Sequence, residues 1–215
     1  MSLNYKSYWR KSGLKGKWGN IFLERLSYYN PKTVLEVGVF CGVTARNICD
    51  FMYEKNNNDF NYIGVDLFGS DQNIKKDEIE PTFLKDQKFS NPLKNFYYNY
   101  LLKENLNSID SVEKFLNKYS QNIKLIAGDT NKVLKQLDLQ NVDFTFLDGG
   151  HSYQTVMSDL SILYEKMKGK KKIILCDDYG DASLIQEVKK AIDDFSNKNN
   201  ISVNLIENRF AELIL

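Results

Sequence analysis

Residues 142–153 read VDFTFLDGGHSY, and this stretch decides which fold the chain can adopt. Its first half is mostly apolar and has the length of a buried β-strand. Its second half brings together Asp148, two glycines and His151, the only histidine of the protein, directly before a predicted helix over 152–167. Open α/β sheets bind their ligands at such strand-to-helix turns, at the carboxyl ends of the strands. The stretch therefore predicts an α/β fold with a ligand site beside Asp148.

The rest of the chain continues this alternation of strands and helices. Apolar runs predict strands at 33–37, 62–67, 123–127, 142–147, 172–176, 201–206 and 210–215. Amphipathic patterns predict helices at 18–29, 43–53, 111–119, 131–137, 152–167 and 184–197, the last of which starts with a capping box at Ser183 and Gln186. Alternating elements indicate a parallel sheet with helices on both faces. We therefore predict one α/β domain over 1–215, with a doubly wound, mostly parallel seven-stranded sheet that carries an antiparallel C-terminal hairpin strand.

The composition limits the classes of partner. The 215 residues suffice for one hydrophobic core, and 42% of them are hydrophobic. Because 29 Lys and Arg residues nearly balance 28 Asp and Glu residues, no basic surface for nucleic acid is expected. No apolar run reaches the roughly 18 residues of a membrane span. Three cysteines without disulfide or zinc spacing favour a reducing compartment. We expect a cytoplasmic protein that binds neither nucleic acid nor membrane.

Two segments depart from the alternation. Residues 1–30 are predicted to form a helical cap, and the unopposed cations of residues 6–17 indicate either a solvated helix face or, less favoured, an attraction for an anionic group. Residues 68–110 form an insertion that is far longer than α/β connections usually are. Its aromatic cluster at 96–100 predicts a lid or an acceptor pocket, and the alternative is that these aromatic side chains belong to the core.

Acidic residues end successive predicted strands. Glu36 precedes a turn with Gly38 and Gly42, whose spacing does not fit a dinucleotide-binding motif. Asp66 ends the second strand, where a carboxylate can accept both hydroxyls of a ribose, and Asp129 follows the third as a ligand, a helix N-cap or both. Asp148 follows the fourth strand, and Asp177 and Asp178 follow the fifth. These last three carboxylates predict a site for a hard cation, which prefers oxygen ligands.

This ordered series resembles the motifs of class I S-adenosylmethionine-dependent methyltransferases. It is most similar to the small metal-dependent O-methyltransferases, which include the catechol type, the macrolide-sugar type and a bacterial group with an Asp-Gly-x-His-x-Tyr signature. Residues 35–42, LEVGVFCG, resemble the first motif of that family, residues 63–66 its ribose motif, and residues 128–129 its adenine-side motif. The resemblance covers about 31–215 without the insertion.

The resemblance implies roles for individual residues. It implies S-adenosylmethionine as a cofactor held by Glu36, Gly38, Gly42, Asp66, Leu67, Asp129, Thr130 and Asp148. It also implies Mg²⁺ or Mn²⁺ held by Asp148, Asp177 and Asp178. His151 stands where the catechol type has a lysine, and we expect it, together with Asp148, to act in catalysis. An imidazole can accept the proton of an acceptor hydroxyl near neutral pH.

The predicted function is Mg²⁺-dependent methyl transfer to a hydroxyl of a small molecule, either a sugar diol or a catechol-like ring. One alternative is a catalytically silent cofactor-binding or regulatory protein of the same fold. A second is a nicotinamide-dependent oxidoreductase, which the glycine spacing disfavours. The sequence leaves open whether the protein forms a homodimer.

Overall fold

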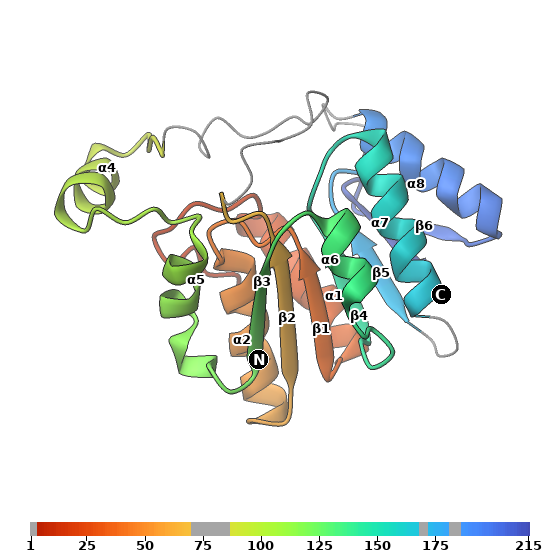
Figure 1. The fold of residues 1–215 in the computed structure, drawn as a ribbon, viewed down its shortest axis with the longest axis horizontal. Helices are drawn as coiled ribbons and strands as arrows, with labels where there is room; N and C mark the ends of the chain where they lie inside the picture. Colours follow the sequence, from red (N-terminus) through yellow and green to blue (C-terminus); the bar gives the residue numbers. More distant parts are fainter. Residues whose placement is uncertain (1–3, 70–86, 168–171, 181–185) are drawn as a thin grey trace.

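A seven-stranded sheet forms the centre of the molecule (Figure 1), with the strand order β3-β2-β1-β4-β5-β7-β6. The computed structural model describes residues 4–69, 87–167, 172–180 and 186–215. The strands are β1 (Thr33–Val37), β2 (Asn61–Asp66), β3 (Ile123–Ala127), β4 (Phe144–Leu147), β5 (Ile173–Cys176), β6 (Val203–Ile206) and β7 (Phe210–Ile214). All neighbouring pairs are parallel except β5–β7 and β6–β7. The predicted doubly wound sheet with an antiparallel C-terminal hairpin is therefore confirmed.

Helices cover both faces of this sheet. They are α1 (Gly16–Tyr29), α2 (Val43–Asn56), α4 (Pro92–Phe96), the π-helical turn η1 (Tyr97–Leu101), α5 (Ile109–Phe115), the 3₁₀ turn η2 (Asn117–Tyr119), α6 (Thr130–Gln136), α7 (Tyr153–Lys166) and α8 (Gln186–Asn199). The helix predicted over 111–119 is thus an α-helix that ends in a 3₁₀ turn, as helix ends often do. Ser183 and its capping box lie outside the described residues.

Alternating side chains along each strand build two hydrophobic layers. On β4, Phe144 and Phe146 face the layer formed by α1, α2 and α5, whereas Leu147 faces the layer formed by α6, α7 and α8. On β5, Leu175 joins the first layer and Ile174 the second. Strands buried on both faces are typical of parallel sheets between helices, since each strand needs apolar residues in both directions.

The strand order also fixes where a ligand can bind. From β1 the chain moves outward through β2 to β3, and then returns to place β4 on the other side of β1. The strand order therefore reverses between β1 and β4, and in open α/β sheets ligands bind at the carboxyl ends of such strands. Asp148 lies at this point, since its backbone N–H donates to the carbonyl of Val37 at 2.8 Å.

The N-terminal residues form an extended arm instead of a complete helical cap. The helix starts at Gly16, and residues 4–15 cross the molecule without regular helical structure. Arg10 is only 8% exposed, so the prediction that the basic residues here form a solvated face is wrong for this side chain. Its guanidinium donates to the backbone oxygens of Cys41 and Leu106 and to the hydroxyl of Ser111.

The described part of the predicted insertion stands apart from the sheet. Figure 1 shows α4 and the adjoining turn beyond α5, at the end of the molecule opposite to α7 and α8. Residues 70–86 of the insertion lie outside the described residues. None of the helices in the described ranges combines the length and apolar character that a membrane crossing requires.

Candidate active site

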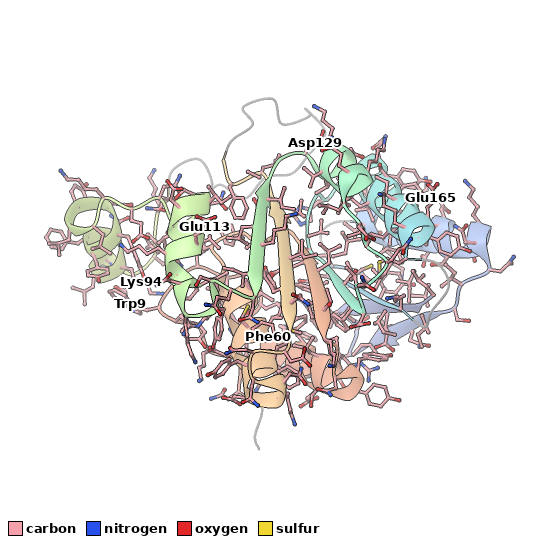
Figure 2. The ribbon with its side chains drawn as sticks, turned by 60° about the horizontal axis from the view of Figure 1, so that its bottom comes forward. Trp9, Phe60, Lys94, Glu113, Asp129 and Glu165 are labelled. Carbon is pink, nitrogen blue, oxygen red and sulfur yellow. The ribbon has the colours of Figure 1, made fainter. Side chains whose placement is uncertain are left out.

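The predicted acidic residues lie along one edge of the sheet. The strand order places the ends of β2, β1, β4 and β5 next to one another, and with them Asp66, Glu36, Asp148 and Asp178. Asp129 follows β3 at the outer end of this row, as Figure 2 shows at the start of α6. The fold thus brings carboxylates from separate parts of the sequence to one edge.

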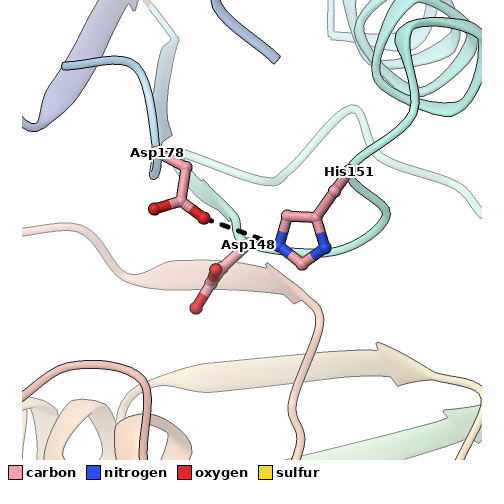
Figure 3. A group of neighbouring side chains, drawn as sticks. All are labelled: Asp148, His151 and Asp178. Atoms are coloured by element: carbon pink, nitrogen blue, oxygen red, sulfur yellow. Dashed lines mark ion pairs between the residues drawn. The ribbon is translucent and has the colours of Figure 1, made fainter. Parts of the chain in front are cut away.

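Three side chains converge closely enough to share one ligand. Asp148, His151 and Asp178 each offer a ligand atom, and these atoms lie within 4.8 Å of one another (Figure 3). The Nε2 atom of His151 is 3.5 Å from Oδ2 of Asp178, and the two side chains are 21% and 30% exposed. The cluster is therefore open to solvent, and a substrate can reach it.

The backbone holds each member of this cluster in place. Asp178 has a left-handed conformation with φ 57°, an uncommon value for a residue with a Cβ, and this turns its carboxylate away from the direction of β5. His151 directly precedes Ser152, which caps α7 by accepting from the N–H of Thr155 at 3.3 Å. The imidazole is therefore attached to a fixed helix start.

Negative charge accumulates at this point. Loss of hydration raises the pKa of Asp148 well above its usual range, and Asp177, Asp178 and Glu36 raise it further. The hydrogen bond from His151 lowers the pKa of Asp178. Such crowding of carboxylates favours a bound cation or proton, since the charges repel one another when the site is empty.

Asp177 does not join the cluster. Its buried carboxylate accepts two hydrogen bonds from the guanidinium of Arg209, at 2.6 Å each. The sequence led us to expect Asp177 among the cation ligands, and that role stays a prediction, since the cluster found in the described residues consists of Asp148, His151 and Asp178. Arg209 comes from the turn between β6 and β7, because the antiparallel pairing of Cys176 with Ala211 places that turn beside the end of β5.

The turn after β1 is shaped for close approach of the backbone. Gly38 has φ 93°, and a Cβ here would lie 1.9 Å from the backbone oxygen of Asp148. Gly42 is the N-cap of α2 with φ 74°. Asp66 accepts from the backbone N–H groups of Phe40 and Phe68, each at 2.8 Å. Both oxygens of Asp66 thus order the turns that follow β1 and β2.

Glu36 is buried, with only 1% of its surface exposed. Burial raises the pKa of its carboxyl to about 8, although the hydrogen bond from the hydroxyl of Tyr62 opposes this rise. A carboxyl of this kind is mostly protonated at neutral pH, and a cationic group placed beside it would favour the charged form.

Asp129 is confirmed as a helix N-cap. Its carboxylate accepts from the backbone and side-chain nitrogens of Asn131, at 3.0 and 3.1 Å, at the start of α6. Thr130 is the first residue of that helix, and Leu67 directly follows β2. The structure places all three at the carboxyl ends of β2 and β3, and their predicted contact with the cofactor stays a prediction.

The comparisons with known proteins agree with this architecture. Residues 35–179, which are 145 of the 215 residues, match the family model of a methyltransferase domain. The chain belongs to this methyltransferase family. This confirms the resemblance seen in the sequence and excludes the nicotinamide-dependent alternative. No curated protein matches the sequence of this methyltransferase.

Solved structures of other methyltransferases share the fold. The O-methyltransferase NovP is 16% identical with a TM-score of 0.63, over 92% of this chain and 80% of NovP. PaMTH1 of Podospora anserina, bound to S-adenosylhomocysteine, is 15% identical with a TM-score of 0.59, over 93% and 79%. CalS11, a TDP-rhamnose 3′-O-methyltransferase of calicheamicin biosynthesis, is 18% identical with a TM-score of 0.56, over 93% and 80%.

The sequence did not reveal every residue that borders the site of this methyltransferase. The N-terminal arm passes close by, because a Cβ on Gly13 would lie 3.9 Å from Oδ2 of Asp148. Nothing in the residues of the arm indicates this approach. Arg209 was missed as well, although the predicted antiparallel hairpin was a signal that could have pointed to the turn at 207–209.

Proposed function

We propose that this methyltransferase transfers the methyl group of S-adenosylmethionine to a hydroxyl oxygen of a small molecule, with a divalent cation bound at Asp148 and Asp178. The donor is supported by the family and by the related fold of PaMTH1, which binds S-adenosylhomocysteine. The observation that carries the proposal is the convergence of Asp148, His151 and Asp178 at the carboxyl ends of β4 and β5.

The donor set fits a divalent cation. Two carboxylates from adjacent strands supply the oxygen ligands that Mg²⁺ and Mn²⁺ prefer, and an imidazole lies within the same 4.8 Å. Asp177 is left out of this set because its carboxylate is already paired with the guanidinium of Arg209. When bound, such a cation lowers the pKa of a coordinated hydroxyl and orients the oxygen for attack.

Residues of the protein carry out proton transfer and position the donor. His151 accepts the proton of the acceptor hydroxyl, and Asp178, whose Oδ2 lies 3.5 Å from Nε2, stabilises the resulting imidazolium. Gly38 and Asp66 shape the turns after β1 and β2 that would hold the donor in line with the acceptor oxygen. Glu36, which is buried near the end of β1, would favour the positive end of the donor.

A pair of neighbouring oxygens is the acceptor that suits this site. Because Asp148 and Asp178 supply only two carboxylate ligands, a six-coordinate cation keeps several coordination positions for oxygens of the acceptor. Sugar diols and catechol-like rings both carry such a pair. The relation to CalS11, which acts on TDP-rhamnose, favours the sugar diol.

The test combines turnover with cation binding. Catechol and TDP-rhamnose are incubated with S-adenosylmethionine, and formation of S-adenosylhomocysteine is followed with Mg²⁺, with Mn²⁺ and with excess EDTA. Binding of Mn²⁺ is measured separately by electron paramagnetic resonance. We expect Asp148→Asn and Asp178→Asn to weaken Mn²⁺ binding at least about tenfold, the scale expected when one charged ligand is lost. Asp110→Asn, at an exposed position on α5, serves as the matched control.

Two results would contradict the proposal. Full turnover in excess EDTA would show that the reaction needs no divalent cation at the cluster. Tight S-adenosylhomocysteine binding with no transfer to either acceptor and no Mn²⁺ binding would instead support a catalytically silent protein of this fold.

A further inference from the structure

The helical segment formed by α4 and η1 has two different faces. Its inner face packs against the body of the protein, where Tyr98 is 6% exposed and stacks on Phe89 with a centroid distance of 5.4 Å. Tyr98 also shares a small cluster with Cys41 and Leu106. Asn99 fixes this orientation, since its side-chain nitrogen donates to the backbone oxygen of Gln87 at 3.1 Å.

The outer face is apolar and exposed. Its five residues follow the helical spacing i, i+3, i+4, i+7 and i+8, and we call them the outer stripe: Leu93, Phe96, Tyr97, Tyr100 and Leu101. Their exposed fractions are 70%, 57%, 38%, 66% and 62%. In a soluble protein a stripe with this spacing normally faces the core, because burial of its apolar area drives the helix onto the protein. Here it faces solvent.

The outer stripe carries no charge. Lys94 is the only charged residue between positions 89 and 102, and it points back to the N-terminal arm. Its Nζ atom lies 5.7 Å from the ring centroid of Trp9 and donates to the backbone oxygen of Arg10, and Figure 2 shows Lys94 and Trp9 next to each other. Interface cores are depleted of charge and enriched in Tyr, Phe and Trp in the same way.

The exposed area matches one half of a stable interface. Together with Leu102 and Trp9, each 43% exposed, the outer stripe presents about 700 Å² of accessible surface, whereas each partner of a standard interface contributes about 800 Å². This is more than the few hundred Å² of apolar patch that monomers usually expose.

We propose that the outer stripe is the contact surface of a symmetric homodimer. In a two-fold interface the same patch meets itself, so a charged patch would repel its copy, and an uncharged helical stripe avoids this cost. Two copies of the segment pack side by side, and the aromatic rings fill the space between them. The surface lies at the end of the molecule away from α7 and α8, so dimer formation leaves the cluster of Asp148, His151 and Asp178 accessible.

The experiment measures the oligomeric state of the full chain by sedimentation velocity across the micromolar range. We expect a concentration-dependent dimer in the wild type. Phe96→Asp and Tyr100→Asp should each weaken dimerisation at least about 30-fold, because each removes a central aromatic contact twice per dimer. Tyr28→Asp, on α1 with 73% of Tyr28 exposed, is the matched control and should leave the dimer intact.

Other outcomes would overturn the proposal. A wild type that stays monomeric throughout the concentration range has no such interface, and a Phe96→Asp variant that remains dimeric uses another surface. Binding of monomers to phosphatidylcholine–phosphatidylserine vesicles, lost in Phe96→Asp, would assign the stripe to a lipid surface instead. Circular dichroism and S-adenosylhomocysteine binding check that each variant is folded, and Leu101→Lys replaces any variant that is not.

Discussion

Replacement of the buried Glu36 by glutamine should change how the stability of the protein depends on pH. The carboxyl of Glu36 has a pKa of about 8 in the folded protein, compared with 4.5 in an exposed reference, because burial disfavours the charged form. When folding raises the pKa of a carboxyl group, the contribution of that group to the stability of the folded protein is fully present below the pKa of the unfolded state. This contribution is lost as the pH rises through the higher pKa.

The size of the effect follows from these two values. Since one pKa unit corresponds to about 1.36 kcal/mol, the rise from 4.5 to about 8 removes about 5 kcal/mol of stability between these two pH values. About 3 kcal/mol of this is already lost at pH 7. Glu36→Gln mimics the protonated carboxyl at every pH. We therefore expect its stability to equal that of the wild type near about pH 5 and to exceed it by several kcal/mol near about pH 8.5.

Urea unfolding of both proteins, without cofactor, at these two pH values and at neutral pH measures the difference. Tyr62→Phe is a control that should raise the pKa of Glu36 further. The hydroxyl of Tyr62 lowers the pKa of Glu36, so its removal should extend the pH dependence to higher pH. Parallel pH dependences of the wild type and Glu36→Gln would refute the reasoning, because Glu36 would then be ionised in the folded protein.

Three further substitutions test other parts of the site. Asp66→Ala should weaken S-adenosylmethionine binding by about 1.5–3 kcal/mol in calorimetry, the scale of a hydrogen bond to a charged group, and unchanged affinity would separate Asp66 from the cofactor. His151→Ala should fold, bind S-adenosylhomocysteine and lose about 10²–10⁴ in turnover, and near wild-type turnover when chemistry is rate-limiting would reduce the imidazole to a packing role. Arg209→Met should destabilise the protein by about 3 kcal/mol in urea unfolding, because Asp177 is left buried and unpaired. Asp177→Asn in the same background should restore part of this loss, and additive losses would contradict the pairing.

Much of the fold could be predicted because it depends on local patterns. The strands at 33–37 and 123–127 agree with the predicted bounds, and the others differ by only one or two residues at one end or at both. Parallel strands buried on both faces produce continuous apolar runs, which are easily recognised in a sequence. The row of acids at the carboxyl ends followed directly from this strand assignment.

The details of the site depend on contacts that the local sequence does not encode. Asp177 and Asp178 are adjacent in the chain, yet Asp177 pairs with Arg209, 32 positions later, whereas Asp178 lies beside His151. The aromatic cluster at 96–100 was expected to be a lid or core. It divides instead into the buried Tyr98 and the exposed Phe96 and Tyr100, because its orientation is set by contacts with distant residues such as Cys41.

The clamp formed by Arg10 has a consequence for the order in which the protein forms. Its guanidinium is buried, and two of its three hydrogen-bond partners, Leu106 and Ser111, lie about 100 positions further along the chain. During synthesis the arm emerges about 100 residues ahead of these partners, yet a buried guanidinium without partners would be costly. The arm therefore stays hydrated until residues 106–111 have been made, and it reaches its native contacts only after that segment is present.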